Sequence, residues 1–177
     1  NQLFPESDDP DQSILVNRAV SGRYNIGSTI KPFIAWSAMH SGLLDSSYIF
    51  EDRGTWKLTS IEEDVCRSGV KCTFKNALGP FGRPSEYGDV TVEDALAVSS
   101  DAFFYRIGEL FYSTPGMRDE LKADLELFGF GSDSGIELPY EWDGRIPDDA
   151  VKKELVELEV LAKGEAMTEA GEPHPWC

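Results

Sequence analysis

The chain has 177 residues, 41% of them hydrophobic and 27% charged, which is enough for one domain with a core and excludes wholesale disorder. Its formal charge of −16 excludes nucleic-acid binding by counterion release and flat binding to an anionic membrane surface. No apolar run approaches the roughly 18 residues of a membrane-spanning helix, and no signal-peptide pattern opens the chain.

The first part of the chain predicts one well-defined helix. Residues 1–13 are polar and predict a loop, and residues 14–20 are compatible with a short extended segment. Apolar residues then recur near helical spacing over residues 28–43, so a helix is predicted there. Gly42 marks its end. Pro32 falls within its first turn or so, where the missing N–H of proline is tolerated.

A turn-rich stretch separates this helix from the next. Residues 45–88 predict only short extended pieces, one of them near residues 55–59. A second helix is predicted to open at Thr91, whose hydroxyl can cap it. Asp94 stands three residues further on, as in a capping box.

The second helical pattern is broken once and then continues. Residues 99–101 (Ser-Ser-Asp) interrupt it, because short polar side chains compete for backbone hydrogen bonds. An apolar helix rich in Phe and Tyr is predicted over residues 102–112. A third helix is predicted over residues 114–128 and ends before Gly129, and a fourth over residues 147–163.

The cysteines favour a small disulfide loop over a metal site. Cys66 and Cys72 enclose five residues, including Gly69, which would let the loop turn. A zinc knuckle needs about two to four residues between its ligands. We therefore predict a Cys66–Cys72 disulfide and an oxidising compartment, with two free thiols as the alternative. No metal site is predicted, and His40 and His174 have no partners at ligand spacing.

The residues Ser28-Thr29-Ile30-Lys31 form an S-x-x-K motif at the start of the predicted helix. Residues three apart share a helix face, so the serine oxygen and the lysine nitrogen can meet. Free N–H groups at a helix N-terminus favour negative charge on an attacked acyl oxygen. A lysine kept neutral can take the serine proton. The motif therefore predicts Ser28 as nucleophile and Lys31 as its base.

Alone, this motif is weak evidence, because Ser68-Gly69-Val70-Lys71 matches it too. That second copy lies between two cysteines and has no helix to align its serine with its lysine. We predict that it is accidental. The first copy has a glycine before it, a proline after it and an apolar helix behind it.

The context of the first copy carries a resemblance to a known family. Residues 17–33 read NRAVSGRYNIGSTIKPF, and residues 95–105 read ALAVSSDAFFY. These segments resemble the first two active-site motifs of penicillin-binding proteins, with Ile26 where a proline is usual. The S-x-D form of the second motif, and the continuation through residues 128–139, resemble the monofunctional, elongation-type class B enzymes. The resemblance spans roughly residues 17–147.

The resemblance implies roles for two residues of the second motif. Ser99 is expected to shuttle a proton. Asp101 stands where the family generally has asparagine and is expected to contact substrate. Because an aspartate only accepts hydrogen bonds, and would favour a charged lysine if it lay near Lys31, its task differs from that of asparagine.

The third family motif, K-[TS]-G, does not occur after Asp101. In the family, its strand lines the acyl pocket and supplies one oxyanion N–H, and we expect the same strand to cover the pocket and remove Lys31 from water. The expectation is therefore a partial transpeptidase domain over residues 1–177, truncated at both ends and inactive alone. It should also be marginally stable and prone to association, with the apolar faces around Ile30, Ile34, Phe103 and Phe104 partly exposed. The fold class implied is α+β, a mainly helical part of the transpeptidase/serine β-lactamase-like fold without its first strands.

By resemblance, the full-length protein is a peptidoglycan D,D-transpeptidase of bacterial cell wall synthesis and cell shape. Ser28 would attack a stem pentapeptide, release D-Ala and pass the acyl group to a neighbouring stem, and β-lactam antibiotics would acylate the same serine. No cofactor is implied. The protein would lie on the outer face of the cytoplasmic membrane, anchored by a segment outside this chain, with a membrane glycosyltransferase as partner.

Two other functions remain open on the sequence. A D,D-carboxypeptidase or a β-lactamase-like sensor would share Ser28 and Lys31. The chain could also be a non-catalytic extracellular interaction module, which would bind no β-lactam.

Overall fold

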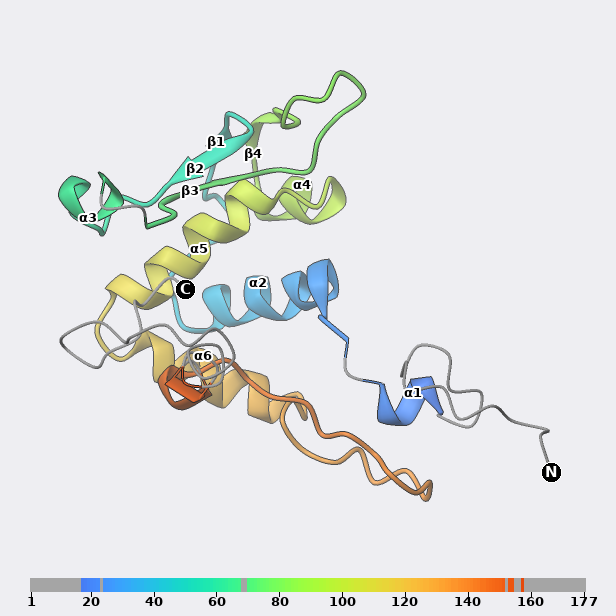
Figure 1. Cartoon of the computed structure of the whole chain (residues 1–177). Coiled ribbons are helices and arrows are strands. Elements are labelled where there is room, and N and C mark those ends of the chain that lie inside the picture. Colours follow the sequence, from blue (N-terminus) through green and yellow to red (C-terminus); the bar gives the residue numbers. More distant parts are fainter. Residues whose placement is uncertain (1–16, 23, 68–69, 152, 155–156, 158–177) are drawn as a thin grey trace.

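The computed structural model describes residues 17–22, 24–67, 70–151, 153–154 and 157. Helices dominate and the strands are short, an α+β arrangement (Figure 1). No helix in this described part is long and apolar enough to cross a membrane. The elements in chain order are α1 (Arg18–Ser21), the 3-10 helix η2 (Gly27–Ile30), α2 (Lys31–His40), β1 (Phe50–Asp52), β2 (Thr55–Lys57), α3 (Glu63–Arg67), β3 (Thr73–Lys75), β4 (Gly88–Val90), α4 (Val92–Ala97), α5 (Asp101–Ser113) and α6 (Met117–Leu127).

Two small antiparallel sheets lie against α5. β1 pairs with β4, placing Phe50 opposite Val90, and β2 pairs with β3, placing Trp56 opposite Phe74. Figure 1 shows these strands on one side of α5, with α2 and α6 on the other. Helix α5 therefore forms the centre of the described structure, contacted by both sheets and by both neighbouring helices.

The first predicted helix is confirmed, with a tighter opening turn. The chain enters it through the 3-10 helix η2 and continues directly into α2, so helical structure spans residues 27–40. Pro32 lies in the first turn of α2, where its nitrogen needs no hydrogen bond. The chain leaves α2 at Gly42, whose φ of 72° lies in the left-handed region that favours glycine.

The predicted capping box is present at the start of α4. The Thr91 hydroxyl accepts from the Asp94 N–H (3.2 Å), and the Asp94 carboxylate accepts from the Thr91 N–H (3.1 Å). Hydrogen bonds from the Thr91 hydroxyl and N–H lower the pKa of Asp94. The predicted interruption also occurs, because α4 ends at Ala97 and α5 starts at Asp101.

The later helices follow the predictions less closely. Helix α6 begins at Met117, after Gly116 with a φ of 80°, and ends at Leu127, one residue before the predicted end. Residues 149–151 and 153–154 are helical, while most of the rest of the predicted helix 147–163 lies outside the described residues. The extended segment expected over residues 14–20 is wrong where it can be compared. Residues 18–21 form α1, because the Asn17 side chain caps a helical turn by accepting from the Ala19 N–H.

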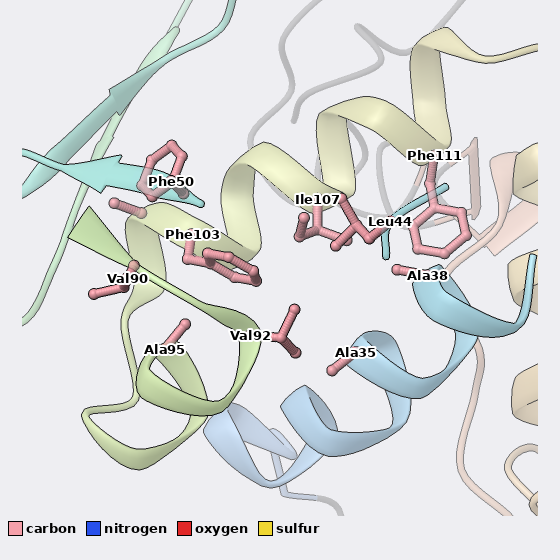
Figure 2. Close-up of a cluster of buried hydrophobic side chains, with 11 residues drawn as sticks. Ala35, Ala38, Leu44, Phe50, Val90, Val92, Ala95, Phe103, Ile107 and Phe111 are labelled. Atoms are coloured by element: carbon pink, nitrogen blue, oxygen red, sulfur yellow. The ribbon is translucent and has the colours of Figure 1, made fainter. Parts of the chain in front are cut away.

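The hydrophobic core lies between α5 and α2. Figure 2 shows Phe103, Ile107 and Phe111 of α5 pointing toward α2, where Ala35 and Ala38 face them. The three α5 residues recur every four positions, so they share one helix face. Their burial is nearly complete, and each such side chain contributes about 1.5–3 kcal/mol of hydrophobic free energy. The small alanines of α2 let the two helices approach closely.

This core contradicts part of the expectation that apolar side chains are exposed. Phe103 is fully buried, so the expectation is wrong for this residue, whereas Ile34 packs against the core and is only partly buried. Exposed large apolar side chains occur on α2, at the end of α6 and above all in loops, where Phe81 and Tyr140 are the most exposed. Trp36 and Phe128 are about 40% exposed and contact each other edge to face, with ring centroids 4.8 Å apart.

A buried carboxylate fastens α5 to the segment after β2. Glu109 is 1% exposed, and all its partners are donors: the Trp56 ring N–H (2.8 Å), the N–H and hydroxyl of Thr59, and the Ser60 N–H (2.6 Å). Arg106 is also within 3.4 Å. Burial opposes ionisation of Glu109, but the hydrogen bonds from Ser60, Thr59 and Trp56 outweigh it and lower its pKa.

We expect Glu109→Gln to lower the free energy of unfolding at pH 7 by about 1–3 kcal/mol, because an amide NH2 would face N–H donors. The lowered pKa of Glu109 gives stability that is present above its ordinary value of 4.5 and is lost as the pH falls through the folded value. Chemical unfolding of both forms should show a large difference in the free energy of unfolding at pH 7 and a small difference at about pH 3. An equal difference at both pH values would contradict a role for the charge.

The structure joins Cys66 and Cys72 in a disulfide, with their Cα atoms 5.6 Å apart. Cys66 lies in α3, and Cys72 lies just before β3, where it is buried. The Cys72 carbonyl accepts from the Leu58 N–H at 2.9 Å. The disulfide loop is thereby fastened to the ribbon of β2 and β3.

We predict that Cys66 and Cys72 are bridged in the mature protein. Opening so short a loop should cost only about 2 kcal/mol, because little chain entropy is gained. Peptide mapping without reduction should recover the two cysteines in one linked peptide. Two thiols that alkylate freely in unreduced protein would count against both the bridge and the oxidising compartment.

Candidate active site

The two motifs predicted from the sequence meet at the side chain of Lys31. Its Nζ atom donates to the Ser99 carbonyl oxygen (2.8 Å), to the Ser99 hydroxyl (3.1 Å) and to Asp101 Oδ1 (2.5 Å). The lysine and these partners are 68 and 70 residues apart in sequence. The structure therefore brings three of the four predicted site residues into direct contact.

Lys31 is buried without help from any other part of a larger protein. The residue is only 7% exposed, and Nζ lies 5.5 Å from the centre of the Phe104 ring. The sequence comparison led us to expect that the K-[TS]-G strand would be needed to remove this lysine from water. That expectation is wrong, because the turn between α4 and α5 and the Phe104 ring already cover it.

Ser28, the fourth predicted residue, lies in η2 one turn before Lys31. In a 3-10 helix, side chains three residues apart are eclipsed, so Ser28 and Lys31 share a face. The backbone N–H of Lys31 donates to the Ser28 carbonyl, which fixes this turn. Ser28 is exposed, and within the described residues its hydroxyl has no hydrogen bond. The hydroxyl is thus accessible to an incoming acyl group.

The backbone at Ser99 has an unusual conformation. Its φ is 55°, in the left-handed region that few residues other than glycine adopt. This turn separates α4 from α5 and presents both the carbonyl and the hydroxyl of Ser99 to Lys31. Such strain is found where the surrounding structure imposes it, often at functional sites.

The Asp101 carboxylate acts on its surroundings as a negative charge. Its side chain is 31% exposed, and one oxygen contacts Lys31. Burial and, secondly, the charge of Asp101 raise the pKa of Tyr105, which lies one turn further along α5. Asp101 therefore lies in direct contact with the lysine.

Sequence reasoning missed three buried polar side chains behind this site. Asp52, Asn76 and Ser100 are at most 3% exposed and are hydrogen-bonded to one another. They lie far apart in sequence, and the first two fall in the turn-rich stretch that predicted little structure. The only local signal was the polar Ser-Ser-Asp run, which contains Ser100.

His40 is better connected than its sequence spacing indicated. Its Nδ1 atom lies 3.1 Å from an oxygen of buried Asp124, whose other oxygen accepts from Ser37 at 2.5 Å. The Glu120 carboxylate also lies close to these two groups, so that His40, Glu120 and Asp124 could together hold a metal ion. Both Asp124 oxygens already have protein partners, so these contacts fasten α6 to α2. His174 and the serine of the second S-x-x-K copy lie outside the described residues.

Comparison with known proteins agrees with this geometry. The family model described as "Penicillin binding protein transpeptidase domain" matches residues 4–164. The chain therefore belongs to the penicillin-binding protein transpeptidase family, as its motifs predicted. Among curated proteins it is similar to peptidoglycan D,D-transpeptidase MrdA from several bacteria, the elongation-type enzymes that its second motif resembled.

The similarity to MrdA covers most of this chain and a small part of the relatives. The identity is 33% over 133 residues for the Escherichia coli K12 protein, covering 75% of this chain and 18% of the relative. For the Acinetobacter baumannii protein it is 31% over 134 residues, covering 76% and 17%. The chain thus spans about a fifth of the length of the curated relatives it matches.

Two solved structures share the fold. Pseudomonas aeruginosa PBP2, determined in complex with WCK 5153, matches with a TM-score of 0.60 and 24% identity, covering 96% of this chain and 33% of that one. Helicobacter pylori PBP2, in a complex with MreC, matches with a TM-score of 0.62 and 19% identity, covering 95% and 27%. The α+β, transpeptidase-like fold expected from the sequence is confirmed.

Proposed function

We propose that this chain is the acylating segment of a longer bacterial peptidoglycan D,D-transpeptidase of the elongation type. The observation that carries the proposal is the set of three contacts that Lys31 makes with Ser99 and Asp101. They join the two family motifs into one site beside an accessible serine. The substrate would be a stem pentapeptide, and β-lactam antibiotics would react in its place.

The proposed reaction begins with the Ser28 hydroxyl attacking the penultimate D-Ala carbonyl of the stem. Lys31, one turn further on, takes the serine proton when neutral. The Ser99 hydroxyl lies 3.1 Å from Nζ and can carry a proton between the lysine and the leaving amine of D-Ala. The acyl group on Ser28 then passes to an amine of a neighbouring stem, and the serine regains its proton by the reverse route.

Asp101 is proposed to hold Lys31 in place and to contact the substrate. Its Oδ1 atom is engaged by the lysine, while its side chain remains partly exposed. The exposed part of this carboxylate can accept from a backbone N–H of the stem peptide but cannot donate to its carbonyl. An asparagine, which most of the family has at this position, could both donate to the peptide and accept from it.

The setting of the longer protein is also a proposal. It would lie on the outer face of the cytoplasmic membrane, anchored by a segment outside this chain, and work with a membrane glycosyltransferase. The similarity to MrdA over a fifth of that protein's length supports this. An oxidising compartment would also suit the Cys66–Cys72 disulfide.

We expect penicillin to acylate Ser28 in the full-length protein. Ser28→Ala should abolish labelling, and Lys31→Ala should slow it by several orders of magnitude, because the pair acts as a unit. Intact-mass measurement and peptide mapping after penicillin treatment would locate the label.

The matched control is Ser68→Ala, which removes the serine of the second S-x-x-K copy and should leave labelling unchanged. Label on Ser68, or label that survives Ser28→Ala, would refute the proposal. Failure of the full-length protein to bind any β-lactam would favour a non-catalytic interaction module. Hydrolysis of D-Ala without any transfer to an amine would favour a D,D-carboxypeptidase.

The chain alone, residues 1–177, should not be a competent transpeptidase. Lys31 is already buried, so the expected deficit lies in the oxyanion donor that the family's K-[TS]-G strand supplies. Loss of one such donor typically costs about 10²–10³ in rate. Fluorescent penicillin incubated with the purified chain measures this, and stoichiometric labelling of Ser28 at the rate of the full-length protein would contradict it.

A further inference from the structure

A buried carboxylate, Asp52, lies directly behind the second motif. It is 1% exposed and sits at the end of β1. Its Oδ1 atom accepts from the Gly54 N–H (2.7 Å) and the Asn76 amide (2.9 Å). Its Oδ2 atom accepts from the same amide (3.0 Å) and from the Ser100 hydroxyl (2.5 Å). Every contact to this carboxylate comes from a donor.

Asn76, after β3, connects the same carboxylate to the start of α5. Its side-chain carbonyl accepts from the Ala102 N–H at 2.7 Å, and its amide donates to Asp52 and to the Ser85 carbonyl. The Ala102 N–H belongs to the first turn of α5, which has no partner within the helix. The orientation of the Asn76 side chain is therefore set at both ends, by a donor on one side and acceptors on the other.

Ser100 joins this polar cluster to the catalytic turn. It is fully buried and caps α5, since its hydroxyl accepts from the Phe103 N–H at 3.0 Å while donating to Asp52. The residue before it is Ser99, whose carbonyl and hydroxyl contact Lys31. The residue after it is Asp101, the third contact of that lysine. Ser100 thus fixes the backbone between the two residues on which Lys31 depends.

Resting on the proposed function, we infer that Asp52 and Asn76 are positioning residues for acylation, acting through Ser100 to hold Ser99 and Asp101 against Lys31. Neither side chain touches the reacting atoms. Ser99 occupies a left-handed conformation that it would leave if Ser100 were released, because the strain is sustained only by its surroundings. Its carbonyl and hydroxyl would then turn away from the lysine.

The competing explanation is that the cluster merely stabilises the fold, and α5 supplies a matched control for it. Glu109 is another buried carboxylate that accepts only from donors, but those partners lie in β2 and just after it rather than in the turn between α4 and α5. Asp52→Asn and Glu109→Gln each place an amide NH2 against donors in the protein interior. Both should lower stability, and only the first should disturb Ser99.

The experiment measures penicillin acylation in the full-length protein, separating the dissociation constant of the initial complex from the first-order acylation rate constant. We expect Asp52→Asn to lower the rate constant per folded molecule about 10- to 100-fold, as small misplacements do, with little change in the dissociation constant. Glu109→Gln should leave the rate constant within about two-fold. Ser100→Ala should slow acylation like Asp52→Asn, and the double variant should be less than additive, because both act through one contact.

Each outcome decides one point. Equal rate constants for Asp52→Asn and Glu109→Gln, at equal folded fraction, would overturn the positioning role. If Asp52→Asn does not fold, Ser100→Ala carries the test, and a wild-type rate constant for it would overturn the inference. A wild-type protein that penicillin does not acylate would instead overturn the proposed function.

Discussion

The candidate active site depends on one buried amine, the Nζ atom of Lys31. Lys31 is covered by the chain's own elements, and its Nζ atom meets the Ser99 carbonyl, the Ser99 hydroxyl and the Asp101 carboxylate. Burying a polar group without such partners would be costly. Because these partners all come from one turn, the position of that turn sets the position of the lysine that we propose as the base for Ser28. The capping contacts of α4 and α5 hold this turn in position.

Local signals in the sequence were enough to predict the helices around the site. Pro32 and Gly42 bound the first one, and the Thr91 and Asp94 pair marks the start of α4, because caps and breakers act through neighbouring residues. The strands were harder to predict. β1 and β4 have only three residues each, and their pairing joins residues about forty apart, for which no local pattern exists.

Only part of the site was predicted, because long-range contacts leave no local pattern in the sequence here either. Ser28, Lys31, Ser99 and Asp101 stand in two short motifs, and the resemblance identified them together. Asp52 and the other polar side chains behind the turn belong to no sequence motif. Their hydrogen bonds join residues that are far apart in sequence and meet only in the fold. The burial of Lys31 was misjudged for this reason, since neither Phe104 nor the turn could be recognised as its cover in advance.

The separation of Lys31 from Asp101 has a consequence for biosynthesis. The two residues are 70 positions apart, so Ser28 and Lys31 leave the ribosome well before the turn that completes the site. Closing a loop of that length lowers the entropy of the chain, and this cost is offset only when α5 packs. Until α5 docks, Lys31 has none of the contacts with Ser99 and Asp101 that complete the site. The contacts around Lys31 therefore form late in folding, once α5 has docked.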